Sequence, residues 1–293
     1  MELMAIPFPA IDPVAISIGP LSVRWYGLAY LAGLVLGWRY MRYLLSRPGL
    51  WNGAPPMKPD QVDDFLLWAT LGTVLGGRLG YVFLYEPGTF LADPMRILMV
   101  WQGGMSFHGG LIGVITAIVV FARLNGVPIL SLGDLAAAAV PFGLFFGRLA
   151  NFINGEVYGD LTSVPWGVLF PQEVLNPGDA YGPRHPSQLY EALLEGIVLF
   201  LVLRYLTHRH FAFNRPGTIA GTFLCGYALS RIFAECFRQW DHSLFFTTDY
   251  FSNGMVYSLP MLAAGAWLIW RSRSGGSKAV DSEVEVLRDV HQS

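Results

Sequence analysis

Charged residues are scarce in this chain. They make up 14% of the sequence, against about 25% in an average soluble domain. Hydrophobic residues make up 53%, and the mean hydropathy of +0.44 is too high for a soluble enzyme of this size. The net charge of −2 and the lack of any basic run argue against a nucleic-acid partner. The composition therefore places the chain among membrane proteins.

Cysteine is also rare. Cys225 and Cys236 fall in one predicted helix, where eleven positions span about 16 Å, so they cannot form a disulfide with each other. Neither has Cys or His neighbours at the spacing of metal ligands. We interpret both as small core residues and expect no metal site and no cofactor. If the chemistry involves a thiol, a substrate must supply it.

Positive charge is missing from the N-terminus. No Lys or Arg precedes Arg24, and Met1 to Pro20 is rich in Pro and Ile with Glu2 and Asp12. This composition does not fit a signal peptide. A first span preceded by no positive charge predicts an N-terminus on the outer face of the membrane.

Hydropathy and helix-breaking residues predict an all-α polytopic membrane protein of about seven transmembrane helices with a small head on the outer side. Each segment has about 18 to 25 residues, enough to cross roughly 30 Å of hydrocarbon. No internal repeat is evident, which counts against the inverted-repeat transporter folds. The expected spans are 22–42, 62–85, 104–122, 133–153, 188–206, 217–236 and 254–271.

The basic residues that flank these spans orient the chain. They gather in alternate connections, which the positive-inside rule places in the cytoplasm, together with a short polar tail at 273–293. The other connections are acidic or neutral. The cytoplasmic set is Arg39, Arg42, Arg47, Lys58, Arg123, Arg204, Arg209, Arg215, Arg271, Arg273, Lys278 and Arg288.

Polar residues interrupt the fourth span near its outer end. Residues 147–159 read GRLANFINGEVYG and carry Arg148, Asn151, Asn154 and Glu156. Charged groups cost a few kcal/mol or more in hydrocarbon, so they are kept there mainly where they line a polar cavity. We therefore interpret this cluster as a buried site. The alternative is an interfacial helix end whose polar residues sit among the lipid headgroups.

Further ionisable residues lie toward the outer ends of other spans. His108 stands between glycine pairs and could accept a proton near neutral pH, or merely hydrogen-bond a neighbouring helix. Glu191 and Glu195 lie one helical turn apart on one face, and one of them could pair with an arginine of a neighbouring helix, a structural role that is favoured over a catalytic one. Arg231 and Glu235 can pair as i and i+4, which leaves Arg238 over for a ligand.

Several arginines gathered toward the outer leaflet indicate an anionic ligand there, with snorkelling to lipid phosphates as the alternative for any one of them. The planar forks of Arg148 and Arg238 suit a phosphate. The residues alone thus point to an enzyme or transporter that handles a lipid phosphate. Glycines at four-residue spacing are expected to let helices approach closely. They are Gly72, Gly76 and Gly80, Gly109 and Gly113, and Gly143 and Gly147.

Residues 147–159 resemble the signature of the prolipoprotein diacylglyceryl transferases, Gly-Arg-x-(Gly/Ala)-Asn-Phe-x-Asn-x-Glu-x-x-Gly. Other segments resemble that family in order and spacing, and together they cover nearly the whole chain up to the tail. They are Trp25-Tyr26-Gly27, Gly76-Gly77-Arg78, Gly104 to Gly110, His185-Pro186-Ser187-Gln188-Leu189-Tyr190-Glu191 and Phe237-Arg238-Gln239.

The resemblance implies an enzyme of the bacterial inner membrane whose active site faces the periplasm. It would move the diacylglyceryl group of phosphatidylglycerol onto the lipobox cysteine of a prolipoprotein and release glycerol 1-phosphate. Residues 1–272 would form one transmembrane catalytic domain. By motif position, the catalytic residues would be His108, Arg148, Arg238, Glu156 and Tyr26. The headgroup would be bound by Arg148, Asn151, Asn154, Gly159 and Arg238.

Two departures from the family concern how the precursor peptide is held. Trp240-Asp241 stands where the family is expected to have Pro-Asp, and the segment between Phe170 and Arg184 is short. Two other functions compete with the transferase: a transporter or flippase for an anionic lipid, and a structural subunit of a larger membrane complex. The subunit leaves the polar cluster unexplained.

Overall fold

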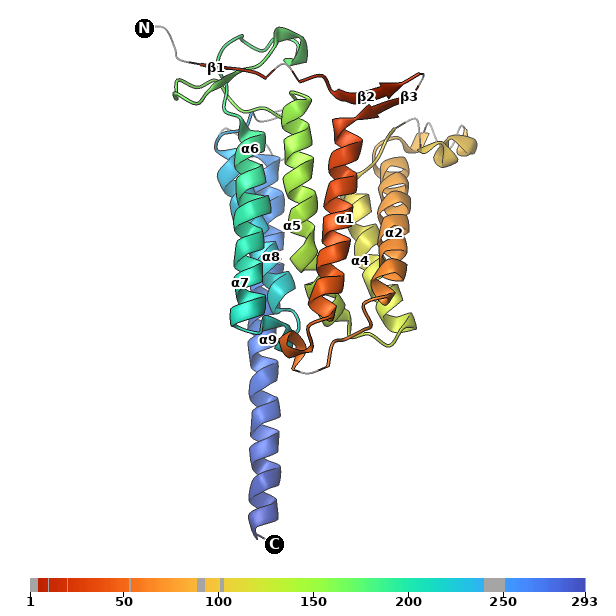
Figure 1. Cartoon of the computed structure of the whole chain (residues 1–293), viewed down its shortest axis with the longest axis vertical. Coiled ribbons are helices and arrows are strands. Elements are labelled where there is room, and N and C mark those ends of the chain that lie inside the picture. The colour runs from red at the N-terminus through yellow and green to blue at the C-terminus, as the bar shows by residue number, and fades with distance from the viewer. Residues whose placement is uncertain are drawn as a thin grey trace. The chain divides into compact units, whose positions relative to one another are not determined.

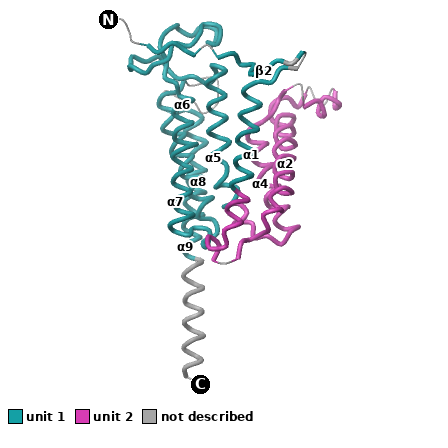
Figure 2. The backbone as a smooth tube through the Cα atoms, in the orientation of Figure 1, with its two compact units in different colours: residues 1–40, 134–293 teal, residues 41–133 magenta. Residues whose placement is uncertain are grey.

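The computed structural model describes residues 5–9, 11–19, 21–52, 54–88, 93–100, 103–239 and 251–292, with the side chains of residues 18, 21 and 275–292 left out. Trp240 and Asp241, which the sequence analysis singled out, lie outside this part. The chain divides into two compact units, one of residues 1–40 and 134–293 and the other of residues 41–133 (Figure 2).

Long helices dominate the described residues (Figure 1). The helices are α1 (Trp25–Leu45), α2 (Gln61–Leu84), α4 (Phe107–Leu124), α5 (Ile129–Ile153), α6 (Ser187–Glu191), α7 (Leu199–Arg209), α8 (Thr218–Glu235) and α9 (Asn253–Gln292). A π-helical turn over Ala192–Val198 joins α6 to α7. Short 3₁₀ turns cover Pro48–Trp51, Pro94–Leu98, Gln172–Val174 and Ala212–Asn214.

Each of the seven expected spans coincides with helix, with boundaries within a few residues; α9 continues past the predicted end at 271. Among the described residues, α2, α4 and α5 are long and apolar enough to cross a membrane by length and composition. Membrane crossing by the other helices stays a prediction.

The expectation of an all-α chain is wrong in the head, which consists of the segments before α1 and between α5 and α6. Short strands form there. β1 (Ile6–Pro7) pairs in parallel with β4 (Val168–Leu169). β2 (Val14–Ile18) and β3 (Leu21–Arg24) form an antiparallel hairpin in which Ile16 lies opposite Val23. Tyr158, Val168 of β4 and Phe170 form a small core, against which Phe8 and Phe152 pack. These segments are too short to give a hydropathy signal of their own.

Glycines in the second unit let α2 and α4 touch, as their spacing predicts. A Cβ on Gly76 would collide with the Gly109 carbonyl oxygen, and one on Gly80 would lie 2.7 Å from the Gly109 Cα. Backbone contact of this kind replaces side-chain interdigitation in lipid. An apolar groove of about 520 Å³ runs along the same two helices, between Trp68 and Leu84 on α2 and between Gly109 and Val120 on α4.

A buried aspartate fixes the start of α8 in the first unit. Asp134, on α5, is fully buried, and its carboxylate accepts hydrogen bonds of 2.7 Å from the backbone N–H groups of Gly217 and Ala220. The first N–H groups of a helix have no partner within the helix, and a carboxylate also suits the positive end of the helix dipole. Asp134 thus ties α5 to α8, which carry the arginines described next.

Candidate active site

Arg148 lies in the last turns of α5 and is bound to two glutamates of a neighbouring helix. Its Nη1 lies 3.2 Å from Glu191 Oε2, and its Nη2 lies 3.1 Å from Glu195 Oε2. Both glutamates have fully buried side chains. Glu191 ends α6 and Glu195 lies in the π-helical turn; π-helical turns are frequent at functional sites. The expectation that one of these glutamates pairs with an arginine of another helix is confirmed, and both of them do so.

Glu191 also accepts hydrogen bonds from two further arginines, Arg231 of α8 and Arg238, which follows the end of α8. Its Oε1 accepts a short hydrogen bond from Arg231 and another of 3.1 Å from Arg238 Nη1. One carboxylate therefore contacts three guanidinium groups. Without it, three positive charges would stand close together in a buried place, where charge repulsion is screened little.

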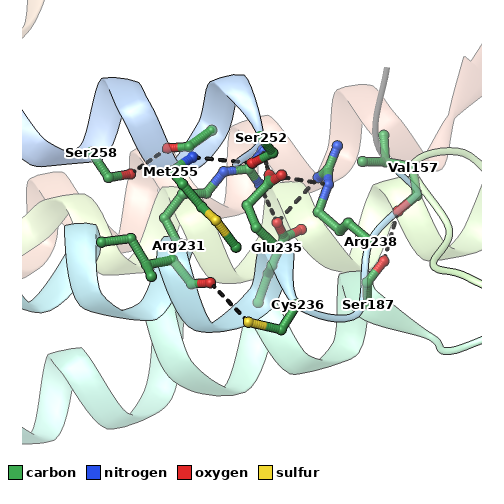
Figure 3. Close-up of polar contacts among 12 residues, drawn as sticks. Val157, Ser187, Arg231, Glu235, Cys236, Arg238, Ser252, Met255 and Ser258 are labelled. Carbon is green, nitrogen blue, oxygen red and sulfur yellow. Dashed lines mark hydrogen bonds and ion pairs between the residues drawn. The ribbon is translucent and has the colours of Figure 1, made fainter. Parts of the chain in front are cut away.

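Glu235 is the third carboxylate of the cluster. It pairs with Arg231 at i and i+4, as the sequence predicts, and its Oε1 lies 3.5 Å from Arg238 Nε. Figure 3 shows Glu235 and Arg238 pointing toward each other beside the first residues of α9. Gly254 of α9 packs directly against the Glu235 carboxylate, where any side chain would collide with it.

The sequence analysis left Arg238 over as an unpaired cation, and this is wrong: it contacts both Glu191 and Glu235. The error arose because Glu191 comes from a distant segment that helical spacing does not reveal. We call the six residues the arginine–glutamate cluster. Its members are Arg148, Glu191, Glu195, Arg231, Glu235 and Arg238.

Exposure differs between the two charge signs in this cluster. The three arginine side chains are 17–18% exposed, whereas the glutamate side chains are at most 6% exposed. The carboxylates thus lie behind the guanidinium groups. Each guanidinium carries five N–H donors, and the contacts with carboxylates leave some of them for an acceptor on the open side. Such a surface is suited to bind a phosphate.

A second polar group lies one turn beyond Arg148 on α5. Asn151 donates a hydrogen bond of 2.8 Å from Nδ2 to Glu156 Oε1. Tyr26 of α1 interacts with the Asn151 side chain, and its hydroxyl lies 3.4 Å from that of Tyr30. Three residues expected in the site (Tyr26, Asn151 and Glu156) are therefore brought together, and they offer both donors and acceptors to a hydroxyl-rich group.

The loop after α5 is fixed by α6. Gln188 donates a hydrogen bond of 2.7 Å to the Glu156 carbonyl. Ser187 donates one of 2.9 Å to the Val157 carbonyl, as Figure 3 shows. Both side chains are fully buried. The motif around Glu191 therefore both supplies a carboxylate to the cluster and positions Glu156. For Asn154, only a backbone hydrogen bond, to Ala150, is seen among the described residues.

Gly159 acts through its backbone. It forms an antiparallel bridge with Arg238, and its N–H donates to the His185 carbonyl at 2.9 Å. A Cβ here would collide with the Phe237 carbonyl oxygen and lie 2.7 Å from His185 Cβ. Only glycine permits this approach to Arg238, which gives Gly159 a structural role; its expected contact with the headgroup stays a prediction.

Polar contacts hold the loop between α5 and α6, which we call the head loop, to the chain next to Arg238. The sequence analysis did not predict these contacts. The Asp179 carboxylate accepts from Gln239 at 2.6 Å and from Tyr158 at 2.8 Å, and it lies 3.6 Å from Arg184. These hydrogen bonds, together with the Arg184 charge, outweigh burial and lower the pKa of Asp179. The buried Arg184 also donates to the Gly159 carbonyl. No local pattern marks these contacts, because the partners are far apart in sequence.

His108 belongs to the second unit, at the second position of α4. Ser106 precedes the helix as its N-cap, and its Oγ accepts a hydrogen bond of 3.2 Å from the Gly109 N–H. Gly109 and Gly110 follow it and are buried against α2, as their lack of side chains allows. The backbone that carries His108 is thus held by α2 within this unit.

Known proteins match the chain over nearly its whole length. The family model for prolipoprotein diacylglyceryl transferase matches residues 13–271. Three relatives bear the name phosphatidylglycerol–prolipoprotein diacylglyceryl transferase. The protein of Rhizobium meliloti (strain 1021) is 54% identical over 280 residues, which are 95% of this chain and 98% of the relative. That of Rhizobium leguminosarum bv. trifolii (strain WSM2304) is 56% identical over 276 residues, 93% of this chain and 96% of the relative. That of Phenylobacterium zucineum (strain HLK1) is 52% identical over 271 residues, which are 90% of this chain and 94% of the relative. With a family match over most of its residues and an arginine-rich site to accompany it, the chain belongs to the prolipoprotein diacylglyceryl transferase family.

Proposed function

We propose that the chain transfers the diacylglyceryl group of phosphatidylglycerol to the lipobox cysteine thiol of prolipoproteins. The products are a thioether-linked lipid and glycerol 1-phosphate. The observation that carries this proposal is the arginine–glutamate cluster, in which three guanidinium groups converge on Glu191. The transferase names of the relatives support the same reaction.

The reaction is a displacement at the glyceryl carbon next to the phosphate. The thiol sulfur forms a bond to that carbon, the bond from the carbon to the phosphate oxygen breaks, and glycerol 1-phosphate leaves with the bonding electrons. Arg148 and Arg238 bind the phosphate and stabilise the charge that develops on it, a role in which fixed cations contribute strongly. Arg231, in contact with the same carboxylate, adds a third guanidinium to this surface.

His108 takes the proton of the thiol. A thiol with a pKa of about 8.5 needs only modest help to ionise. Neither Cys225 nor Cys236 takes part in the reaction, because the nucleophile is the thiol of the substrate. Asn151, Asn154 and Glu156 orient the glycerol of the headgroup, for which their hydrogen-bonding groups are suited, and Tyr26, which interacts with Asn151, lines the same cavity.

The chain works within the bacterial inner membrane as a single transmembrane domain of residues 1–272 with a cytoplasmic tail at 273–293. Seven spans place the N-terminus and the active site on the periplasmic side. This is supported by the asymmetric distribution of basic residues and by three helices suited to cross a membrane. Membrane lipids surround it, and phosphatidylglycerol and the signal peptide of a prolipoprotein reach it from the bilayer.

A reconstituted assay tests this function. Purified protein is mixed with phosphatidylglycerol vesicles and a lipobox peptide, and the peptide is read by mass spectrometry. We expect a mass gain equal to one diacylglyceryl group on the cysteine, absent with the Cys→Ser peptide and lost with Arg148→Ala. No gain with folded protein would refute the transferase and leave lipid transport as the function to test.

A further inference from the structure

Arg78 is a buried, charged residue of α2 that has no role in the proposed reaction. Its side chain is buried near the outer end of α2, with 5% of its surface exposed. A buried arginine in an enzyme that handles a lipid phosphate could serve as one more phosphate ligand. Its contacts decide against that.

All five N–H groups of Arg78 are directed to backbone carbonyls of one loop. Nε donates to Ile97 at 3.0 Å. Nη1 donates to Gly103 at 2.5 Å and to Gly104 at 3.1 Å, and Nη2 donates to Arg96 at 2.5 Å and to Met99 at 3.3 Å. A guanidinium has five N–H donors. None is therefore left for a lipid phosphate.

The loop that Arg78 holds leads directly into α4. Gly104 lies against Arg78 and Tyr81, where a side chain would collide with the tyrosine ring. Two residues later, the Ser106 N–H donates to the Gly77 carbonyl at 2.9 Å, and Ser106 caps the helix. His108 follows in the first turn of α4. Gly77 and Arg78, two neighbouring residues of α2, therefore both bind the segment that leads into this turn.

We infer that Arg78 is a positioning residue, which anchors residues 96–99 and 103–104 through five carbonyls and thereby fixes the first turn of α4 and the place of His108. This inference rests on the proposed function, in which His108 receives the thiol proton. Lysine cannot replace the arginine here, because one ammonium group cannot reach carbonyls on both ends of the loop.

Hydrogen exchange and steady-state kinetics together test the inference. The variants are Arg78→Lys and Arg78→Gln, with Arg96→Gln as matched control. Arg96 is an exposed arginine of the same loop whose backbone carbonyl, but not its side chain, binds Arg78. In both Arg78 variants we expect at least about tenfold faster amide exchange over residues 96–110 and unchanged exchange over 155–186. We expect kcat to fall at least about tenfold, KM for phosphatidylglycerol to stay within about twofold, and the control to behave as wild type.

The inference would be overturned if Arg78→Gln raised the KM for phosphatidylglycerol, Arg78→Lys had the wild-type KM, and amide exchange over residues 96–110 were unchanged. Arg78 would then be a lipid ligand. Unchanged kcat in both variants would also overturn it. If the Arg78 variants unfold, Gly104→Ala pushes the loop off the guanidinium with Arg78 in place, and the same exchange and kcat changes are expected. Should wild type transfer no lipid, the proposed function fails, whereas the exchange measurement still reports whether Arg78 holds the loop.

Discussion

Glu191 Oε2 lies 3.2 Å from Nη1 of Arg148, although the two residues come from different helices. The carboxylate is fully buried, and its other oxygen contacts Arg231 and Arg238. A buried carboxylate costs several kcal/mol to desolvate and is stable only when it is paired. The relation between these two residues therefore determines how the arginine–glutamate cluster is assembled.

Glu191→Gln is expected to disrupt this surface. The amide keeps the shape but removes the negative charge that three guanidinium groups share, and breaking a buried ion pair costs about 3–5 kcal/mol. We expect a lower unfolding temperature and at least about a tenfold loss of kcat/KM in the transfer assay. Glu173→Gln, an exposed change in the head, is the control. Wild-type activity and stability in Glu191→Gln would contradict the role of this carboxylate.

Arg148→Lys keeps the positive charge and loses the planar fork. An ammonium group cannot contact Glu191 and Glu195 and also present paired donors to a phosphate. Removing a donor that stabilises a developing charge costs about 10²–10³ in kcat. We expect a fall of this size, measured with phosphatidylglycerol and a lipobox peptide, while Arg123→Lys on the exposed end of α4 stays at the wild-type level. Full activity of Arg148→Lys would show that charge alone suffices.

Gly159→Ala tests the close approach of the head loop to Arg238. The new methyl group would meet the Phe237 carbonyl, so the bridge to Arg238 has to open. We expect reduced activity and a lower unfolding temperature. Gly133→Ala is the matched control, since a methyl group there has no neighbour within 4 Å. Equal behaviour of the two variants would refute the backbone role of Gly159.

His185 gives the head a pH-dependent stability. Burial lowers the pKa of its imidazole, against an opposing effect of Asp160, and its Nδ1 lies 3.0 Å from the Tyr190 hydroxyl. A base whose pKa is lower in the folded state stabilises the fold above its unfolded-state pKa of about 6.5 and loses this contribution as the pH falls through the folded value. We expect the unfolding temperature to fall between about pH 7 and pH 5, and to fall less in His185→Gln. Identical pH curves would contradict this.

Asp134→Ala is expected to loosen α8 from α5. The change leaves the N–H groups of Gly217 and Ala220 buried without their acceptor, which costs about 1–3 kcal/mol for each unsatisfied group. Asp64→Ala, at an exposed position of α2, is the control. Denaturation of the two variants in detergent would show the difference, and equal stability would argue against the cap.

Much of the helical framework could be predicted because hydropathy and helical spacing are local properties. The expected spans coincide with helices, and the Arg231–Glu235 pair forms as its i,i+4 spacing indicates. The signature around Arg148 and Asn151 was sufficient to identify the family. The head could not be predicted in this way. Its strands are short, and Asp179 meets Gln239 across a long stretch of chain.

The sequence by itself determined that the chain is an apolar helical protein, which family it belongs to and which residues are the candidates for its chemistry. These follow from composition, periodicity and motif. Only the tertiary structure decided that Arg238 is paired, that Gly159 acts through its backbone and that Arg78 binds carbonyls. Each of these depends on a contact between segments far apart in sequence, and such contacts arise from packing and the desolvation of charge, which spacing along one helix does not encode.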